Sequence, residues 1–146
     1  MIESRPVSLE HIVYLTPRLR AFDKLECMAA GYTAEDGLRY SVAVSRHAFT
    51  FLHEDLPLGV YGVCPIQDGG ALFWLLGTDE IAKHGKDFLR RSLELRDKYL
   101  SYYKYLTNAV HVENKASIRW LTRLGAQWGE TTAANGVPLI HFTIRR

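Results

Sequence analysis

The sequence predicts an α/β protein of the α+β kind, in which helices cover both faces of one mixed, mostly antiparallel sheet. Two observations lead to this prediction. Three apolar segments follow one another between residues 48 and 78, separated by short stretches rich in Gly and Pro, as in an antiparallel meander. A long amphipathic segment over 86–103 then leads into another β-rich stretch, which is the order of a βαβ crossover. The two strands that flank the long helix should therefore be parallel neighbours.

Length and composition restrict the class of protein. The 146 residues suffice for a hydrophobic core and match the usual size of one domain, so we expect a single domain over 1–146. A formal net charge of +2 is too small to indicate nucleic acid as a partner. Cys27 and Cys64 stand far apart, with no partner at metal-ligand spacing, which predicts reduced cysteines in a cytosolic protein. No apolar run is long enough for a membrane span, and the N-terminus lacks a signal-peptide core.

The first third of the chain is expected to hold a short strand over 1–7 and three helices. Ser8 and Thr33 are good N-caps for the first and third helices, because their hydroxyl oxygens accept from free N–H groups of the first turn. Pro17 ends the first helix and Gly31 ends the second, which begins near Leu19. For the third helix, alternation over Ser41 to Ser45 also allows a strand.

The middle of the chain is expected to form the three strands of the meander and then two helices. The strands are AFTFLHED, VYGVCPI and ALFWLLGT, with LPLG and QDGG as the turns between them. The last strand, from Ala71 to Leu76, is apolar throughout, which indicates a central strand buried on both faces. A short helical turn over 79–84 and a long helix from Lys86 to Tyr103 follow.

The stretch AVHVENKASIRWLTRLGA, residues 109–126, combines a strand with an amphipathic helix. Asn114 is the expected N-cap of that helix, and Gly125 is the expected C′ residue that ends it. Two strands over 127–130 and 138–144, joined by a loop containing TTAANG, complete the sheet. An ordinary βα unit without a function would show the same features.

Ligands in parallel sheets favour the carboxyl ends of the strands, where helix N-termini offer free N–H groups to anions. We therefore expect a site where the strand that ends at Gly77 and the strand that ends at Val112 finish.

The run NKASIRWLTRLGA, from Asn114 to Ala126, resembles the final motif of the GNAT superfamily of N-acetyltransferases. The runs LPLGVYGV, ALFWLLGTDEIAKHGKDFLRRS and YLTNAVHVENKASIRWLTRLGA are similar to small GNAT-like proteins of short-tailed bacteriophages, the internal virion protein A-like family. The resemblance covers most of the chain from about Leu56 onward. It implies the GNAT acyl-CoA N-acyltransferase fold and transfer of an acetyl group from acetyl-CoA to an amine of a small molecule or a host protein.

The resemblance also implies where acetyl-CoA, or CoA, would bind. The pantetheine arm would lie along a strand backbone, and the diphosphate would lie on the loop that follows. The implied residues are Trp74, Leu75, Leu76 and Gly77 on the strand and Lys83, His84, Gly85 and Lys86 in the loop. Asn114 corresponds to the asparagine of the motif, which commonly contacts the cofactor.

The candidate general bases are Glu113 and His111 at the end of the parallel strand, with His53 and Glu54 on the meander as alternatives. Because side chains alternate along a strand, His111 faces the cleft if Glu113 does. The competing interpretation is that His111 is a core histidine and Glu113 a surface acid beside the helix cap.

Two positions depart from the GNAT pattern. The glycine-rich phosphate loop is replaced by TDEIAKHGKDF, which has only Gly85. Lys83, His84 and Lys86 could supply charge in place of that geometry, whereas Asp79 and Glu80 would repel an anion if they point inward. The tyrosine that often reprotonates the CoA thiolate, seven residues after the asparagine, is replaced by Leu121. These departures leave open a catalytically inactive GNAT-like phage protein that serves as a virion component or as a binder of a host protein. The expected location is the host cytoplasm, or packaging in the virion.

Other features have simpler interpretations. The basic residues Lys83, Lys86, Arg90 and Arg91 are typical of a solvated helix face, and the three tryptophans are typical of core packing. Binding of nucleic acid through the basic helix has little support, because acidic residues are interspersed and no platform of aromatic and basic residues is present.

Overall fold

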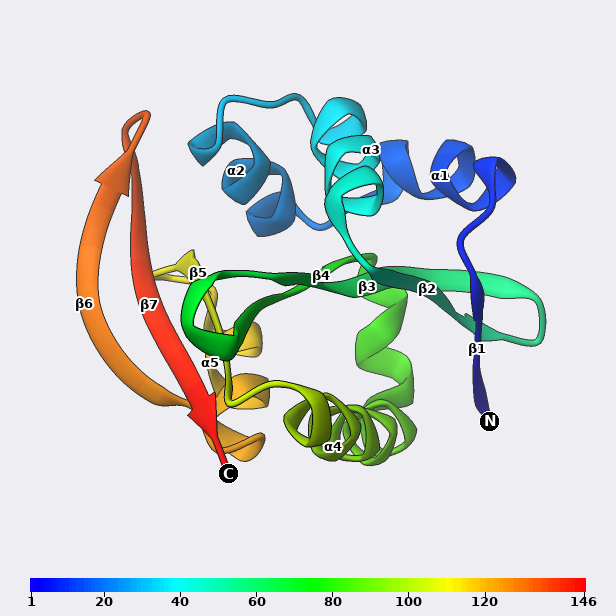
Figure 1. Cartoon of the computed structure of the whole chain (residues 1–146). Coiled ribbons are helices and arrows are strands. Elements are labelled where there is room, and N and C mark those ends of the chain that lie inside the picture. The colour runs from blue at the N-terminus through cyan, green and yellow to red at the C-terminus, as the bar shows by residue number, and fades with distance from the viewer.

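The computed structural model describes residues 1–146 and contains one seven-stranded sheet with helices on both faces (Figure 1). The strand order is β1-β2-β3-β4-β5-β7-β6. Every neighbouring pair is antiparallel except β4 and β5, which are parallel. The predicted fold class and the predicted parallel pair are both confirmed.

The elements follow the expected order. The strands are β1 (Ile2–Pro6), β2 (His47–His53), β3 (Leu56–Pro65), β4 (Gly70–Gly77), β5 (Tyr105–His111), β6 (Gln127–Ala134) and β7 (Val137–Arg145). The α-helices are α1 (Leu9–Leu15), α2 (Ala21–Ala29), α3 (Ala34–Val44), α4 (Gly85–Tyr102) and α5 (Lys115–Arg123), with short 3-10 helices η1 (Thr16–Arg18), η2 (Gln67–Gly69) and η3 (Asp79–His84). None of the helices is both long and apolar enough to cross a membrane.

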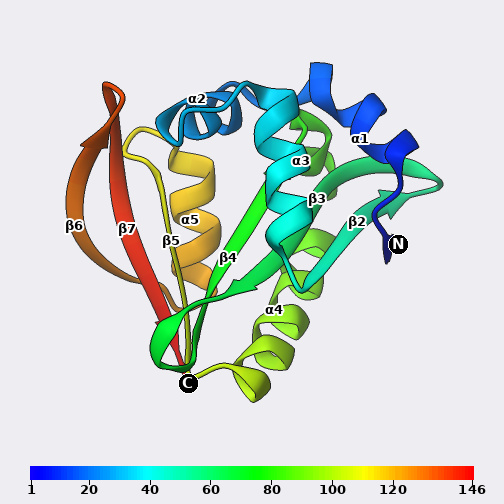
Figure 2. The same ribbon diagram turned by 45° about the horizontal axis from the view of Figure 1, so that its top comes forward.

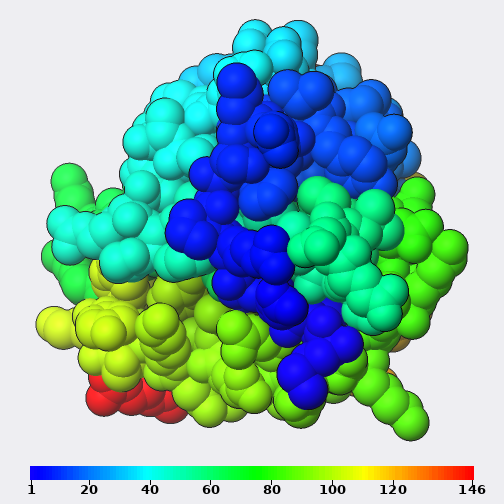
Figure 3. Space-filling view, turned by 90° about the vertical axis from the view of Figure 1, so that its right-hand side faces the viewer, coloured from blue at the N-terminus to red at the C-terminus, as the bar shows by residue number.

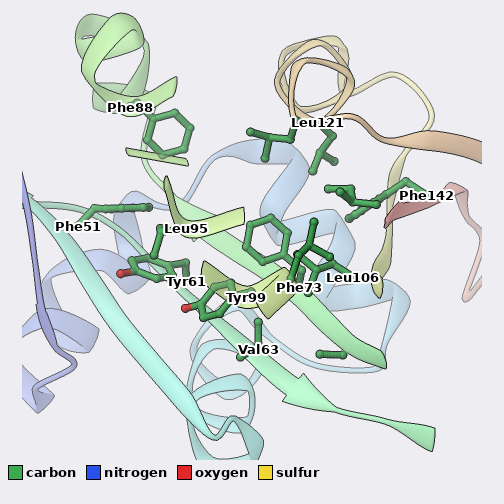
Figure 4. Close-up of a cluster of buried hydrophobic side chains, with 14 of the residues drawn as sticks. Phe51, Tyr61, Val63, Phe73, Phe88, Leu95, Tyr99, Leu106, Leu121 and Phe142 are labelled. Carbon is green, nitrogen blue, oxygen red and sulfur yellow. The ribbon is translucent and has the colours of Figure 1, made fainter. Parts of the chain in front are cut away.

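The helices form two layers. α1, α2 and α3 cover one face of the sheet, and α4 and α5 cover the other (Figures 1 and 2). Figure 3 views the β1 end of the sheet, where the N-terminal residues lie between these two layers. The larger hydrophobic cluster lies between the sheet and the α4/α5 layer, and includes Phe73, Phe88 and Leu121 (Figure 4). A smaller cluster, which includes Leu15, Leu38 and Leu76, lies under the α1–α3 layer.

The predicted helix ends are confirmed by their local hydrogen bonds. The side chains of Ser8, Thr33 and Asn114 each accept a backbone N–H three residues later, at 3.1 to 3.2 Å. Gly125 has a φ of +94°, the left-handed conformation that ends a helix. Residues 41–44 continue the third helix, so the strand alternative is wrong there.

Three strand boundaries differ from the prediction. LPLG lies inside β3, and the turn before it is Glu54–Asp55, because both residues adopt positive φ, as a tight hairpin requires. β6 continues to Ala134, because Asn135–Gly136 alone makes the second hairpin turn, with φ of 49° and 77°. β5 begins at Tyr105, four residues before the predicted start.

Candidate functional site

The candidate site lies where β4 and β5 separate. The two strands pair over only three residue pairs, from Gly70–Tyr105 to Leu72–Thr107. At the fork, the Asn108 side chain donates from Nδ2 to the Phe73 carbonyl at 3.2 Å, and its Oδ1 accepts the Ala109 N–H at 2.8 Å. Asn108 thus replaces main-chain pairing at the last point where the strands are close, and beyond it the strands diverge.

The edge of β4 beyond the fork is partly occupied by the chain itself. Thr78 N–H donates to the Leu58 carbonyl of β3. Because backbone groups alternate in direction along a strand, those of the even-numbered residues of β4 point toward β3, and those of Leu75 and Gly77 point toward β5. Gly77 N–H donates to Asp23 Oδ2 at 2.8 Å, and the Gly77 carbonyl accepts the Arg20 N–H at 2.9 Å. The backbone N–H and C=O of Gly77 are therefore both hydrogen-bonded to residues at the start of α2. Only Leu75 still presents its backbone groups to the gap.

The edge of β5 is closed from the same helix. His111 N–H donates to Glu26 Oε2 at 2.9 Å, and the Asn114 amide donates to the same oxygen at 3.2 Å. No hydrogen bond reaches the other carboxylate oxygen of Glu26. Asp23 and Glu26 are one helical turn apart on α2, so a single face of this helix bridges the ends of both diverging strands.

Burial controls the electrostatics of this acid pair. Asp23 is 1% exposed, and burial raises its pKa, although Arg20 opposes the rise with two hydrogen bonds at 2.9 and 3.1 Å. Burial, and then the negative charge of Asp23, raise the pKa of Glu26 to about 7. The hydrogen bonds from His111 and Asn114 act in the opposite direction. Glu26 therefore changes its charge near neutral pH.

One cavity lies at the fork, and a second lies next to it. The first, of about 360 Å³, lies among α2, α3 and the separated ends of β4 and β5, and its lining is mostly apolar. Glu26, Asp23 and Asn108 are among its few polar residues. The second, of about 330 Å³, lies among η3, the start of α4 and α5. The residues that line both are Arg20, Ser117 and Trp120.

The loop in which a diphosphate would bind is a 3-10 helix, η3, with Asp79 and Glu80 in its first turn. Lys83 pairs with Glu80 at 3.0 Å, and the His84 ring lies 4.1 Å from the ring of His53. Gly85 has open space around its α-carbon, so nothing packs closely against it. The loop therefore differs from the glycine-rich turn that the resemblance implies, because it carries acidic side chains in its first turn and a single glycine at its end.

The predicted base residues do not come together at the fork. His111 is buried, its ring lies 4.8 Å from Phe22, and its Nδ1 accepts the Glu113 N–H at 3.0 Å. The Glu113 side chain is exposed. His53 lies at the β2–β3 hairpin, beside His84 and away from the cavities. The geometry agrees with the competing interpretation of a core histidine and a surface acid.

The position of the missing tyrosine lies in the core. Leu121 is 1% exposed and has no hydroxyl to offer. Trp120, next to it, packs 6.0 Å from Phe73 and 5.3 Å from Phe88, and its Nε1 is buried without a partner. This agrees with core packing for that tryptophan.

Three residues that matter at the fork, Asp23, Glu26 and Asn108, were missed by sequence reasoning. The available signal was a pair of acids three residues apart in a helix that also carries the buried Cys27. Acids on the core side of a helix indicate a buried partner, but they do not reveal which partner.

Solved structures show which fold this chain has, and related sequences show which family it belongs to. The structure is similar to the ribosomal-protein-S18-alanine N-acetyltransferase of Escherichia coli, with a TM-score of 0.72, 14% identity and coverage of 99% of this chain and 94% of that one. It is also similar to a GNAT-family acetyltransferase of Bacillus anthracis, with a TM-score of 0.70, 11% identity and coverage of 99% and 94%. The fold is thus that of the GNAT acetyltransferases.

The sequence itself matches phage proteins. The chain is 29% identical over 140 residues to the probable scaffold protein gp13 of Escherichia phage T7, covering 93% of this chain and 92% of that protein. The family model described as "Bacteriophage T7, probable scaffold protein Gp13" matches residues 54–132, which include β4, η3, α4, β5 and α5. This chain therefore belongs to the phage T7 probable scaffold protein Gp13 family and carries that family's sequence on a GNAT fold.

Proposed function

We propose that this chain acts in the assembly of a phage particle, as a GNAT-fold protein that does not use acetyl-CoA. The relative in phage T7 is described as a probable scaffold protein, which supports a structural role. Under this proposal the chain acts in the host cytoplasm or within the virion, and its partner is another phage protein. An internal position in the virion is a finer version of this proposal, and binding to a host protein is an alternative to it.

The observation that carries the proposal is the occupied edge of Gly77. A pantetheine arm that lies along β4 needs backbone N–H and C=O groups on that edge. Here the Gly77 N–H donates to Asp23, and the Gly77 carbonyl accepts from Arg20. A ligand would have to displace a buried ion pair to reach them. The acidic η3 turn and Leu121 add to this disagreement, so the residues present do not fit acetyl-CoA.

The test is titration with acetyl-CoA, followed by thermal unfolding and calorimetry. We expect no stabilisation at millimolar acetyl-CoA. A ligand that binds only the folded state would add about 2.7 kcal/mol to the free energy of unfolding at a hundred times its dissociation constant. Saturable stabilisation that disappears in Gly85→Glu, at the exposed start of α4, would contradict the proposal.

A genetic test addresses the assembly role directly. A phage that lacks this protein is complemented with the wild type or with Glu26→Gln, and particles are counted by electron microscopy and plaque titre. Glutamine keeps the size and the accepting oxygen of Glu26 but cannot take up a proton. We expect normal particles with Glu26→Gln, whereas a requirement for proton transfer at the fork would abolish complementation.

N-acetyl transfer to an amine of a small molecule or host protein is the second candidate function. One observation favours it. One carboxylate oxygen of Glu26 accepts two hydrogen bonds, and the other accepts none within the chain. With a pKa of about 7, that carboxylate suits proton removal from an amine. Glu113 and His111 remain predicted bases for the same reaction.

A further inference from the structure

The two outer edges of the sheet differ in how they are protected. β1 is five residues long and carries Pro6, which has no N–H, and Arg5, which pairs with Glu3 and Asp55 at 3.1 Å each. Short length, proline and charge are the usual means by which edge strands avoid pairing with other chains. The β1 edge is therefore closed to an additional strand.

The β6 edge has fewer of these protections, namely one charged residue and a register shift between Trp128 and Thr131. β6 is eight residues long and ends the sheet, and no other element lies beyond it (Figures 1 and 2). Glu130 is its only charged residue, and it contains neither lysine nor proline. The side chains of residues 130–133 are all exposed. An edge strand of this kind is a template for pairing with another chain.

The backbone direction in β6 follows from the hairpin and from β5. The Pro138 carbonyl accepts the Val112 N–H of the β5 side, so the backbone groups of Pro138 face away from β6. Ala133 lies opposite Pro138 in the β6–β7 register. Two opposite residues of an antiparallel pair point their backbone groups either both toward each other or both away from each other, so the N–H and C=O of Ala133 point outward. Thr131, two residues earlier and opposite Ile140, does the same.

Outward groups at Thr131 and Ala133 are symmetric about Thr132. A second copy of β6, related by a two-fold axis at Thr132, would pair Thr131 of each copy with Ala133 of the other through four main-chain hydrogen bonds. Glu130 would lie opposite Ala134, so no like charges would meet. Only one edge of the sheet is open, so this pairing closes at two copies instead of extending into a fibre.

We propose that the β6 edge is a homodimer interface, in which two sheets join through antiparallel pairing of β6 centred on Thr132. The occupant is a second copy, because the outward groups match their own symmetry mate and the strand carries almost no charge to select a different partner. The inference goes beyond the proposed function, and it does not depend on whether the fork binds a cofactor.

The test combines crosslinking with measurement of mass in solution. In a Cys64→Ser background, Thr132→Cys places two thiols opposite each other at the axis, within disulfide distance. The matched control is Glu130→Cys, whose two copies would lie about 13 Å apart along the strand. We expect Thr132→Cys to form a disulfide-linked dimer under mild oxidation at least about tenfold faster than the control.

A third variant, Thr131→Pro, removes an outward N–H that β7 does not use, so it should keep the fold and the circular dichroism spectrum of the monomer. By light scattering after gel filtration, we expect a concentration-dependent dimer for the wild type and a monomer for Thr131→Pro. A wild type that stays monomeric at high concentration, or equal crosslinking of the two cysteine variants, would overturn the proposal.

Discussion

At the fork between β4 and β5, single polar side chains replace the main-chain pairing found elsewhere in the sheet. Asn108 bridges the strands at their last close approach, Asp23 binds the β4 edge, and Glu26 binds the β5 edge. Each satisfies backbone groups that would otherwise be buried without partners. Residues of this kind determine whether the gap is open to a ligand.

Glu26 should make stability depend on pH near neutrality. Its pKa is about 7 in the folded state against an ordinary value of 4.5, so between these values the folded state holds a proton that the unfolded state has lost. The free energy of unfolding therefore falls as pH rises from about 4.5 to about 7, by about 3 kcal/mol at most, and then levels off. Urea unfolding of the wild type and of Glu26→Gln at several pH values measures this contribution. A difference between the two that does not change with pH would contradict the assignment.

At the scale of elements, local signals explain most helix and turn boundaries. Caps and left-handed glycines depend on residues within one turn of each other, which the chain order displays directly. The β6–β7 hairpin shows the limit, because TTAANG suggested a loop whereas Thr131 to Ala134 continue the strand. Pairing with β7 supplies hydrogen bonds that outweigh the weak strand preference of alanine.

Two glycines should respond in opposite ways to alanine. Gly136 has a φ of +77°, so Gly136→Ala should lower the free energy of unfolding by about 1 kcal/mol. Gly85 begins α4 in the right-handed helical conformation with open space around its α-carbon, so Gly85→Ala should raise the free energy of unfolding by about 0.5 kcal/mol. Thermal unfolding measures both. Destabilisation by Gly85→Ala would show that this glycine has a role the geometry does not reveal.

At the scale of the whole molecule, the sheet is two blocks joined at a narrow seam. One block is β1-β2-β3-β4, the other is β5-β7-β6, and only three residue pairs connect them. α2 lies across the seam and binds both blocks through Asp23 and Glu26 (Figure 2). In this chain, side chains of α2 therefore connect the two blocks at positions where an unsplit sheet would have hydrogen bonds between the strands.

Hydrogen exchange of the folded protein should detect this arrangement. The amide of Leu75 faces the gap and should exchange faster than those of Trp74 and Leu76, which face β3. The amide of Gly77 should be protected by Asp23, and Asp23→Ala should remove that protection and destabilise the fold by about 3 kcal/mol. Lys24→Ala, at an exposed position of the same helix, is the control. Slow exchange at Gly77 in Asp23→Ala would contradict the predicted contact.

The sequence by itself determined the order of elements, the parallel pair, the caps at Ser8, Thr33 and Asn114, and the substitution of Leu121 for a tyrosine. These features depend on periodicity and on residues close together in the chain, so they can be read without knowing what packs against what. The tertiary structure alone decided that Asp23 reaches Gly77, 54 residues away, and that Glu26 reaches His111, 85 residues away. A buried acid requires a partner, but only the packing of α2 over the fork selects which backbone groups it binds.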